Sequence, residues 1–103
     1  MLFKYTIERG DASICDKIEN LVFKNKCYIE VGIANQDILI CDQIQEKDSK
    51  SFCYYKIGLA KQNLSICNKI DKQNYKKICI YEVEESRSFF KNTIQNLFSI
   101  KFI

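Results

Sequence analysis

Six cysteines stand at a regular spacing along this chain of 103 residues, and cysteine is its most chemically versatile side chain. Intervals of 12 and 14 residues alternate strictly from the first cysteine to the last. Such a set could form disulfide bonds, hold a metal ion or carry out thiol redox chemistry. The six positions are Cys15, Cys27, Cys41, Cys53, Cys67 and Cys79.

Structural disulfides across the shorter interval are the interpretation that the spacing favours. If the chain turns near residue 21, Cys15 and Cys27 face each other across an antiparallel helical hairpin. A bond from Cys27 to Cys41 fits less well, because it needs a turn centred at residue 34 while the expected turn lies near 35–36. Each bond closes a loop of about 13 residues, which stabilises a fold by about 3 kcal/mol. The predicted pairs are Cys15–Cys27, Cys41–Cys53 and Cys67–Cys79.

Other uses of the cysteines stay open at this point. Zinc sites usually take two ligands from a C-x2-C pair, and the nearest cysteines here are 12 residues apart, although adjacent repeats could bring four thiolates together. Redox catalysis commonly uses a C-x-x-C motif to lower a thiol pKa, and the sequence has none. The thiols could also be buried and unpaired, acting as small hydrophobic residues. We expect no bound metal and no cofactor.

The cysteine spacing belongs to a 26-residue repeat that runs through three copies. Residues 11–18 read DASICDKI, residues 37–44 read DILICDQI, and residues 63–70 read NLSICNKI. Further along, CYIEVGIA at 27–34 matches CYYKIGLA at 53–60. A fixed period of this length is typical of stacked units that share one continuous core. The sequence therefore predicts a single all-α domain, a small α-solenoid of three helical hairpins at about 11–36, 37–62 and 63–88.

Each repeat has the pattern of a short helix followed by a longer one. An Asx residue precedes each short helix, where its side chain can cap free backbone N–H groups; these are Asp11, Asp37 and Asn63. An isoleucine–cysteine pair and a later isoleucine form one apolar face of each short helix. The longer helices carry stripes at positions i, i+4 and i+7. These stripes are Cys27, Val31 and Ala34 in the first repeat and Cys53, Ile57 and Ala60 in the second.

Two glycines and two aspartates recur at fixed repeat positions. Gly32 and Gly58 lie inside the longer helices, where glycine costs about 1 kcal/mol relative to alanine. Since apolar residues continue beyond each glycine, we expect a neighbouring helix to pass too close for a Cβ atom. Asp16 and Asp42 are expected to be solvent-facing acids in a first helical turn, favoured by the helix dipole.

The pattern changes at both ends of the array. Residues 1–10 fit the repeat as an incomplete leading unit with a helix at about 2–9. In the third repeat, polar Glu84, Glu85 and Ser86 replace small and apolar residues, as expected of a unit without a successor. A closing amphipathic helix is predicted over 88–101, with more aromatic residues than closure needs. We expect a homodimer through residues 88–103, with contacts from Phe89, Phe90, Leu97 and Phe98.

Positive charge is concentrated in the second half of the chain. Residues 1–52 carry seven basic and nine acidic groups, whereas residues 53–103 carry nine and four. A solvated helix face is the simpler interpretation of the basic third repeat, and nucleic-acid or anion binding, with Tyr75 available for stacking, is the alternative. The basic residues concerned are Lys69, Lys72, Lys76 and Lys77.

Several classes of function lack their residues in this sequence. Histidine is absent, which excludes Ser-His and Cys-His catalysis, and no Gly-rich phosphate loop or G-x-S-x-G motif occurs. We therefore do not expect an enzyme. No apolar run is long enough to span a membrane and no signal peptide is visible, so we expect no membrane association. Cysteines without an export signal slightly favour a thermostable intracellular protein of a hyperthermophile over a secreted one.

The repeat resembles the cysteine-bearing short α-hairpin tandem repeats of uncharacterised archaeal and bacterial proteins. The resemblance covers about residues 11–86 and rests on a pattern D-x-S-x-C-x-x-I followed by C-Y-x-x-[IV]-[AG]-x-A. In the first copy these residues are Asp11, Ser13, Cys15, Ile18, Cys27, Tyr28, Val31 and Ala34. The array is more distantly similar to tetratricopeptide-type solenoids, whose period is about 34 residues. Because such arrays usually bind proteins, the resemblance implies a non-catalytic protein–protein interaction module.

Overall fold

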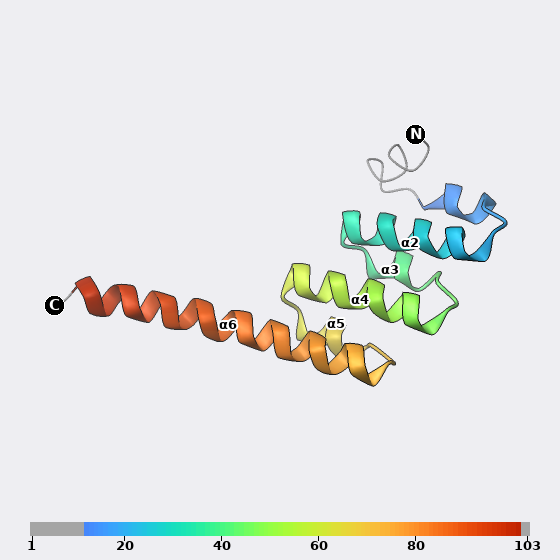
Figure 1. Ribbon diagram of the computed structural model, residues 1–103. Coiled ribbons are helices and arrows are strands. Elements are labelled where there is room, and N and C mark those ends of the chain that lie inside the picture. Colours follow the sequence, from blue (N-terminus) through green and yellow to red (C-terminus); the bar gives the residue numbers. More distant parts are fainter. Residues whose placement is uncertain (1–11, 102–103) are drawn as a thin grey trace.

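The computed structural model describes residues 12–101, and side chains for residues 12–87. Within this range every regular element is a helix, and short and long helices alternate along the chain (Figure 1). The leading helix predicted at 2–9 and the predicted cap Asp11 lie outside the described residues. The elements are the 3-10 helix η1 (Ser13–Lys17), α2 (Leu21–Asn35), α3 (Ile38–Cys41), α4 (Lys47–Lys61), α5 (Leu64–Asn68) and α6 (Gln73–Lys101).

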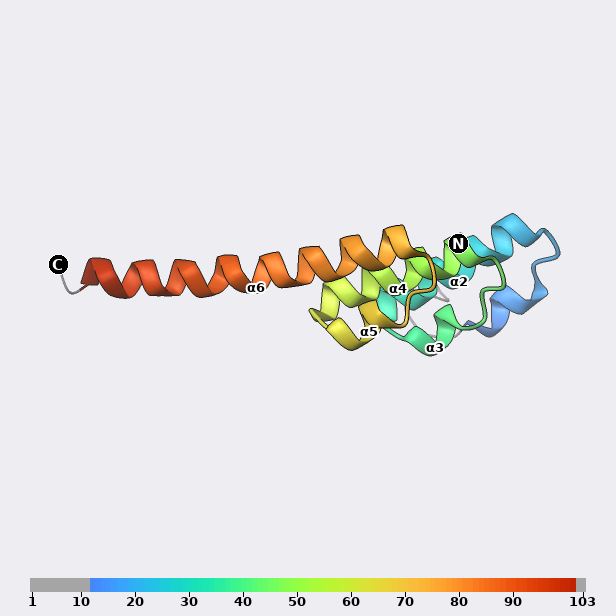
Figure 2. The same cartoon turned by 90° about the horizontal axis from the view of Figure 1, so that it is seen from below.

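The 26-residue period of the sequence sets the positions of the helices. The long helices α2, α4 and α6 begin at residues 21, 47 and 73. They form a row in which α2 packs against α4 and α4 against α6, while η1, α3 and α5 lie on one side of that row (Figures 1 and 2). Helix α3 contacts both α2 and α4, and α5 contacts both α4 and α6. The predicted all-α class is confirmed for the described part of the chain.

Capping side chains determine where most of these helices begin. Asp37 accepts a hydrogen bond from a first-turn backbone N–H group of α3, and Asn63 accepts two in α5, as predicted. Asn20 caps α2 in the same way. At the start of α4, the carboxylate of Glu46 accepts from the backbone N–H groups of Asp48 and Ser49. Hydrogen bonds from Ser49 and Asp48 lower the pKa of Glu46, because they stabilise its ionised form.

Helices α2 and α4 end in the same left-handed turn. Gln36 and its repeat equivalent Gln62 have φ values of 51° and 53°. The Asp37 N–H group donates to the Gly32 carbonyl over 3.0 Å, and Gln36 donates to Ile33 over 3.1 Å. This pair of bonds, which recurs 26 residues later, satisfies carbonyls at the helix end. Each turn then leads directly into the Asx cap of the next short helix.

Helix α6 does not stop where α2 and α4 stop. A separate closing helix over 88–101 was predicted, but α6 continues without a break from Gln73 to Lys101. That boundary was wrong because the stop signals are missing: Ser88 and Phe89 replace the left-handed glutamine and the Asx cap. The last 14 residues extend α6 past the end of the row by roughly 20 Å, at 1.5 Å per residue (Figures 1 and 2). The molecule is correspondingly elongated, with extents of 63 × 30 × 16 Å.

The apolar core lies between the row of long helices and the short helices. It contains the six cysteines together with Val31, Ile57 and Val83, all at 1% exposure or less. The isoleucines predicted to be buried in the second and third repeats, Ile40, Ile44, Ile66 and Ile70, are buried, whereas Ile14 and Ile18 of the first repeat are half-buried. Ala34 and Ala60 were expected to continue the buried stripes but are exposed. Each alanine lies in the last turn of its helix, at the edge of the stack.

Candidate functional site

The six cysteines form three disulfide bonds, each joining a short helix to the long helix that follows it. The pairs are those that the spacing predicts: Cys15–Cys27, Cys41–Cys53 and Cys67–Cys79. Their Cα atoms are 5.5–5.7 Å apart, which is ordinary disulfide geometry. No cysteine is left free, so the chain offers no thiolate to a metal ion or to redox chemistry in this state. The disulfides are structural connections within each repeat.

Each glycine of the long helices packs beneath the disulfide of the following repeat. A Cβ atom at Gly32 would lie 3.1 Å from Cys53 Sγ, and one at Gly58 would lie 3.0 Å from Cys79 Sγ. The sequence predicts a close approach of this kind, and the approaching atoms are sulfurs and isoleucine methyl groups from the next repeat. The glycines therefore set how closely one repeat stacks on the next.

Two tyrosines bridge the short and long helices of the first and second repeats. The hydroxyl groups of Tyr28 and Tyr54 donate hydrogen bonds to Asp16 and Asp42. Burial and the hydrogen bond to Asp16 raise the pKa of Tyr28 to about 12, and burial and the hydrogen bond to Asp42 raise that of Tyr54. The two aspartates are exposed as expected, and Asp16 lies in the first turn of η1, but Asp42 is the C-cap of α3 and not a first-turn acid. Both also accept these bonds and so do more than face the solvent.

The aspartate–tyrosine link was missed at the sequence level, although the repeat alignment contains a signal for it. In the third repeat both partners change together, since Asn68 replaces the aspartate and Ile80 replaces the tyrosine. Residues that recur together and disappear together within one chain indicate a contact. The described residues leave no buried side-chain nitrogen or oxygen atom without a hydrogen bond.

An aromatic cluster lies where α4 meets α6. The rings of Phe52, Tyr55 and Tyr75 contact one another with centroids 5.8–6.5 Å apart, and Lys56 Nζ lies 5.7 Å from the Phe52 centroid. The Tyr55 hydroxyl also donates to Glu82 on α6 over 2.8 Å. Tyr75, considered above as a platform for a nucleic-acid base, is therefore half-buried between two aromatic neighbours.

The four lysines of the third repeat differ in their surroundings. Lys72 forms an ion pair with Asp48 of α4, with an Nζ–Oδ1 distance of 3.2 Å. Lys69 and Lys77 are exposed, and Lys76 is partly covered. One of the four charges is thus matched within the chain, at the point where the start of α6 meets the start of α4.

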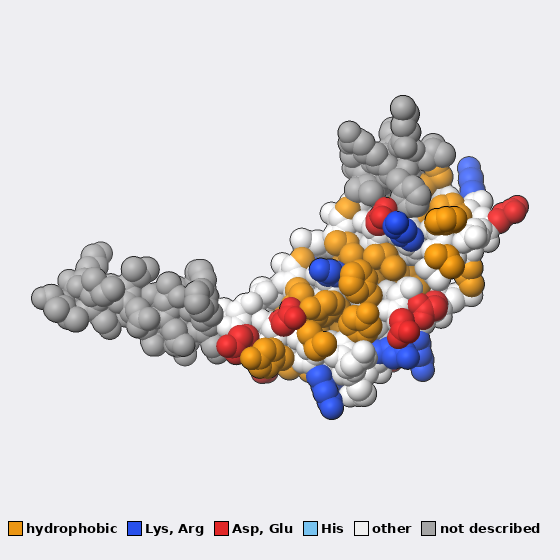
Figure 3. All heavy atoms as spheres, viewed as in Figure 1, with side chains coloured by type: hydrophobic (Ala, Val, Ile, Leu, Met, Phe, Trp, Pro, Cys, Tyr) orange, Lys and Arg blue, Asp and Glu red, His pale blue; other side chains and the backbone are white. Residues whose placement is uncertain are grey.

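The side of α6 that faces away from α4 is uncovered. Ile78 and Tyr81 are 46% and 65% exposed, although their repeat equivalents Phe52 and Tyr55 are partly buried against α6. Figure 3 shows hydrophobic side chains gathered across the row of long helices, with charged side chains around and between them. Three neighbouring residues at the start of α2, Leu21, Val22 and Phe23, are also exposed.

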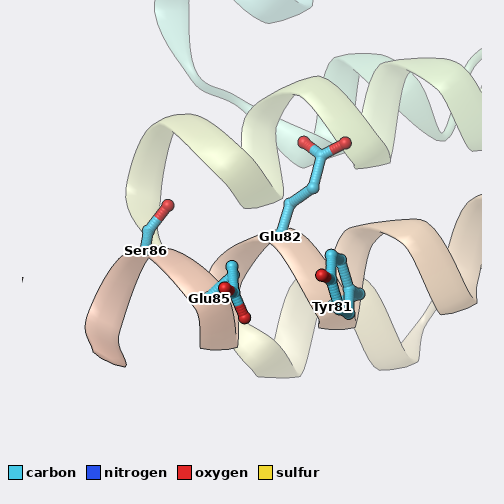
Figure 4. A pocket seen from close by; sticks show the side chains of 4 residues that line it. All are labelled: Tyr81, Glu82, Glu85 and Ser86. Atoms are coloured by element: carbon cyan, nitrogen blue, oxygen red, sulfur yellow. The ribbon is translucent and has the colours of Figure 1, made fainter. Parts of the chain in front are cut away.

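A shallow depression of about 350 Å³ lies on α6, and it is lined by Tyr81, Glu82, Glu85 and Ser86. Figure 4 shows Glu82 and Ser86 directed toward α4, while Tyr81 and Glu85 point away from it. A second depression of about 340 Å³ lies at the other end of the stack, between η1, α2 and α3. Neither combines a histidine base or a free thiol with another reactive group, because the chain has no histidine and all its cysteines are bonded.

The predicted contact residues Phe89, Phe90, Leu97 and Phe98 lie on the projecting part of α6, but their side chains are outside the described range. Their role stays a prediction. None of the helices in the described range is both long and apolar enough to cross a membrane. Comparisons with protein-family models, with curated proteins and with solved structures find no match to this chain.

Proposed function

We propose that this protein is a non-catalytic interaction module: an α-solenoid of three 26-residue hairpins, held rigid by disulfides, that presents α6 to a protein partner. The observation that carries the proposal is the uncovered side of α6. Large apolar side chains that are partly buried in the second repeat are open to solvent in the third. Exposed aromatic and aliphatic residues on a rigid helix are typical of contact surfaces.

The disulfides support this function through rigidity. Three buried bonds connect every short helix to its long helix, and the glycine contacts then position each repeat on the next. A surface that is already ordered loses less conformational entropy on binding, which favours affinity. The projecting half of α6 adds a second contact surface, and the proposed contacts of Phe89, Phe90, Leu97 and Phe98 belong there.

Site-specific photo-crosslinking tests the proposal. A photoreactive phenylalanine analogue is placed at Tyr81 in one full-length variant and at the exposed Gln43 of the opposite, short-helix side in a control. In native extract, we expect crosslinks to a protein partner from position 81 only. Crosslinks of equal yield from both positions, or none from position 81, would contradict an interaction surface on α6.

Nucleic-acid or anion binding through the basic third repeat is the alternative function. It rests on the exposed Lys69 and Lys77, while the ion pair of Lys72 and the packing of Tyr75 weigh against it. Binding to single-stranded RNA that weakens steeply with salt and is lost on Lys69→Glu would support the alternative. Absence of binding at low salt would rule it out.

A further inference from the structure

The side of α6 that faces away from α4 carries a charge pattern that the inner repeats lack. At three repeat positions, the next repeat covers the residues of the first and second repeats, and the third repeat leaves the same positions open. Asn25 and Ser51 are buried at 8% and 2% exposure, but Lys77 replaces them. Glu84 replaces the buried glycines, and Glu85 replaces Ile33 and Leu59, which are partly buried.

These changes place opposite charges symmetrically about one aromatic residue. Lys77 lies four residues before Tyr81, and Glu85 lies four residues after it. Residues four apart on a helix share a face, so all three lie along one exposed side of α6, with Ile78 beside them. A change made only to solubilise the last repeat would not need acid and base on opposite sides of an exposed tyrosine.

We propose that this face binds a second copy of the same chain, with the two α6 helices antiparallel and Tyr81 at the two-fold axis. In that arrangement Lys77 of each protomer meets Glu85 of its partner, and Ile78 with Tyr81 forms the apolar centre. A two-fold interface must be self-complementary, which the order of base, tyrosine and acid fulfils. This inference rests on the proposed function, because it names the partner of the α6 surface.

A head-to-tail arrangement of copies fits the same face poorly. In that arrangement the first repeat of one copy, with its Cys15–Cys27 disulfide, would stack on the last repeat of another copy. The contact would be of the same kind as the contact between successive repeats within one chain. At the inner junctions even a single Cβ atom would lie 3.0–3.1 Å from a sulfur. The full side chain of Glu84 stands at that position in the third repeat, so the two-fold arrangement is the one that its exposed face accepts.

Charge exchange in the full-length protein tests the proposal. Sedimentation velocity from about 5 μM to about 500 μM covers the affinities of a small interface. We expect reversible dimers of the wild type, and dissociation constants raised at least about tenfold in Lys77→Glu and in Glu85→Lys, because each creates two like-charge contacts. Lys26→Glu, the same charge change on an exposed residue of α2, serves as the control and should leave the dimer unchanged.

Mixing the two variants is the decisive step. Lys77→Glu carries two acids and Glu85→Lys two bases on this face, so a mixed dimer regains both opposite-charge contacts. We expect the equimolar mixture to dimerise at least as well as the wild type, although each variant alone dimerises more weakly than the wild type. A monomeric wild type, or a mixture without recovery, would overturn the proposal. So would a dimer that survives both variants and is lost on Leu97→Glu, since that result places the contact in residues 88–103.

The outcome also separates this inference from the proposed function. A protein that stays monomeric but crosslinks from position 81 to a different protein keeps its interaction surface and loses only the second copy as its partner. Circular dichroism of each variant checks that the helices are intact, and the exposed positions of residues 77 and 85 make unfolding unexpected.

Discussion

Replacing Gly58 by alanine probes the contact that sets the spacing between repeats. In isolation the substitution favours the helix by about 1 kcal/mol, because glycine has more conformational freedom to lose. In this stack the new Cβ atom would lie 3.0 Å from Cys79 Sγ, 3.3 Å from Cys67 Sγ and 3.5 Å from Ile66 Cγ2. The gain in helix preference and the cost of the steric contact have similar sizes. The sign of the net change in the free energy of unfolding therefore shows which of the two is larger.

The geometry indicates that the steric effect is the larger one. Contacts of 3.0–3.3 Å are tighter than nine in ten of those that real Cβ atoms make, so the neighbouring sulfurs must give way by a few tenths of an ångström. The sulfurs belong to a disulfide that is fully buried and joined to two helices, and it cannot rotate away as a free side chain could. Overpacking of a core costs typically about 1–3 kcal/mol. With the upper half of that range and the helix preference subtracted, Gly58→Ala should destabilise the protein by about 1–2 kcal/mol.

Guanidinium unfolding of the oxidised protein measures this change, and the third repeat supplies a matched control. Glu84 occupies the equivalent helix position and is exposed. There, alanine should be more stable than glycine by about 1 kcal/mol. Gly32→Ala should cost less than Gly58→Ala, since its closest sulfurs are 3.1 and 3.5 Å away. A Gly58→Ala protein as stable as the wild type, or more stable, would refute the view that the disulfide limits the approach of the repeats.

Three further predictions concern the links within the repeats. Replacing both Cys41 and Cys53 by alanine should lower the free energy of unfolding by about 3 kcal/mol, and equal stability in guanidinium would contradict a structural disulfide. The pKa of Tyr28 rises from 10.0 to about 12 on folding. The contribution of Tyr28 to the free energy of unfolding is therefore fully present below pH 10 and is lost as the pH rises toward 12. Tyrosinate absorbance should therefore show tyrosines that titrate above the usual range, and Tyr28→Phe should remove one of them, while Tyr54 and Tyr55, whose pKa values are also raised, remain. Asn63→Ala should cost about 1 kcal/mol in thermal unfolding and Asn63→Asp much less, because aspartate keeps the cap.

Much of the fold could be predicted from the sequence because the repeat amplifies weak signals. A single glycine inside a helix is ambiguous, but Gly32 and Gly58 at one repeat position indicated a steric role, and both lie against sulfur. The disulfide pairing followed from interval length and turn position in the same way. Asx residues ahead of apolar turns indicated the caps at Asp37 and Asn63.

The parts that were not predicted depend on long-range contacts or on missing signals. The Tyr28–Asp16 bond joins residues 12 apart across a turn, and neither residue type alone implies the other. The continuous α6 depends on two absent stop residues, whereas the aromatic pattern after residue 88 suggested a new element. The candidate surface was placed on residues 88–103, while the exposed Ile78 and Tyr81 were not considered. The polar residues Glu84, Glu85 and Ser86 already indicated a repeat without a successor, but which apolar side chains this leaves exposed on α6 depends on how the repeats pack.

The stacking contact also explains why this array ends where it does. A repeat can accept a successor only if its long helix offers glycine beneath the incoming disulfide and small or apolar residues around it, as Gly58 and its neighbours do. The third repeat keeps its own disulfide and so still stacks on the second, but Lys77, Glu84 and Glu85 close its outer side to a further repeat. If stacking alone shaped this surface, polar residues throughout would serve equally well. The retention of Ile78 and Tyr81 among those charges is therefore the feature on which the proposed contact with a second copy of the chain rests.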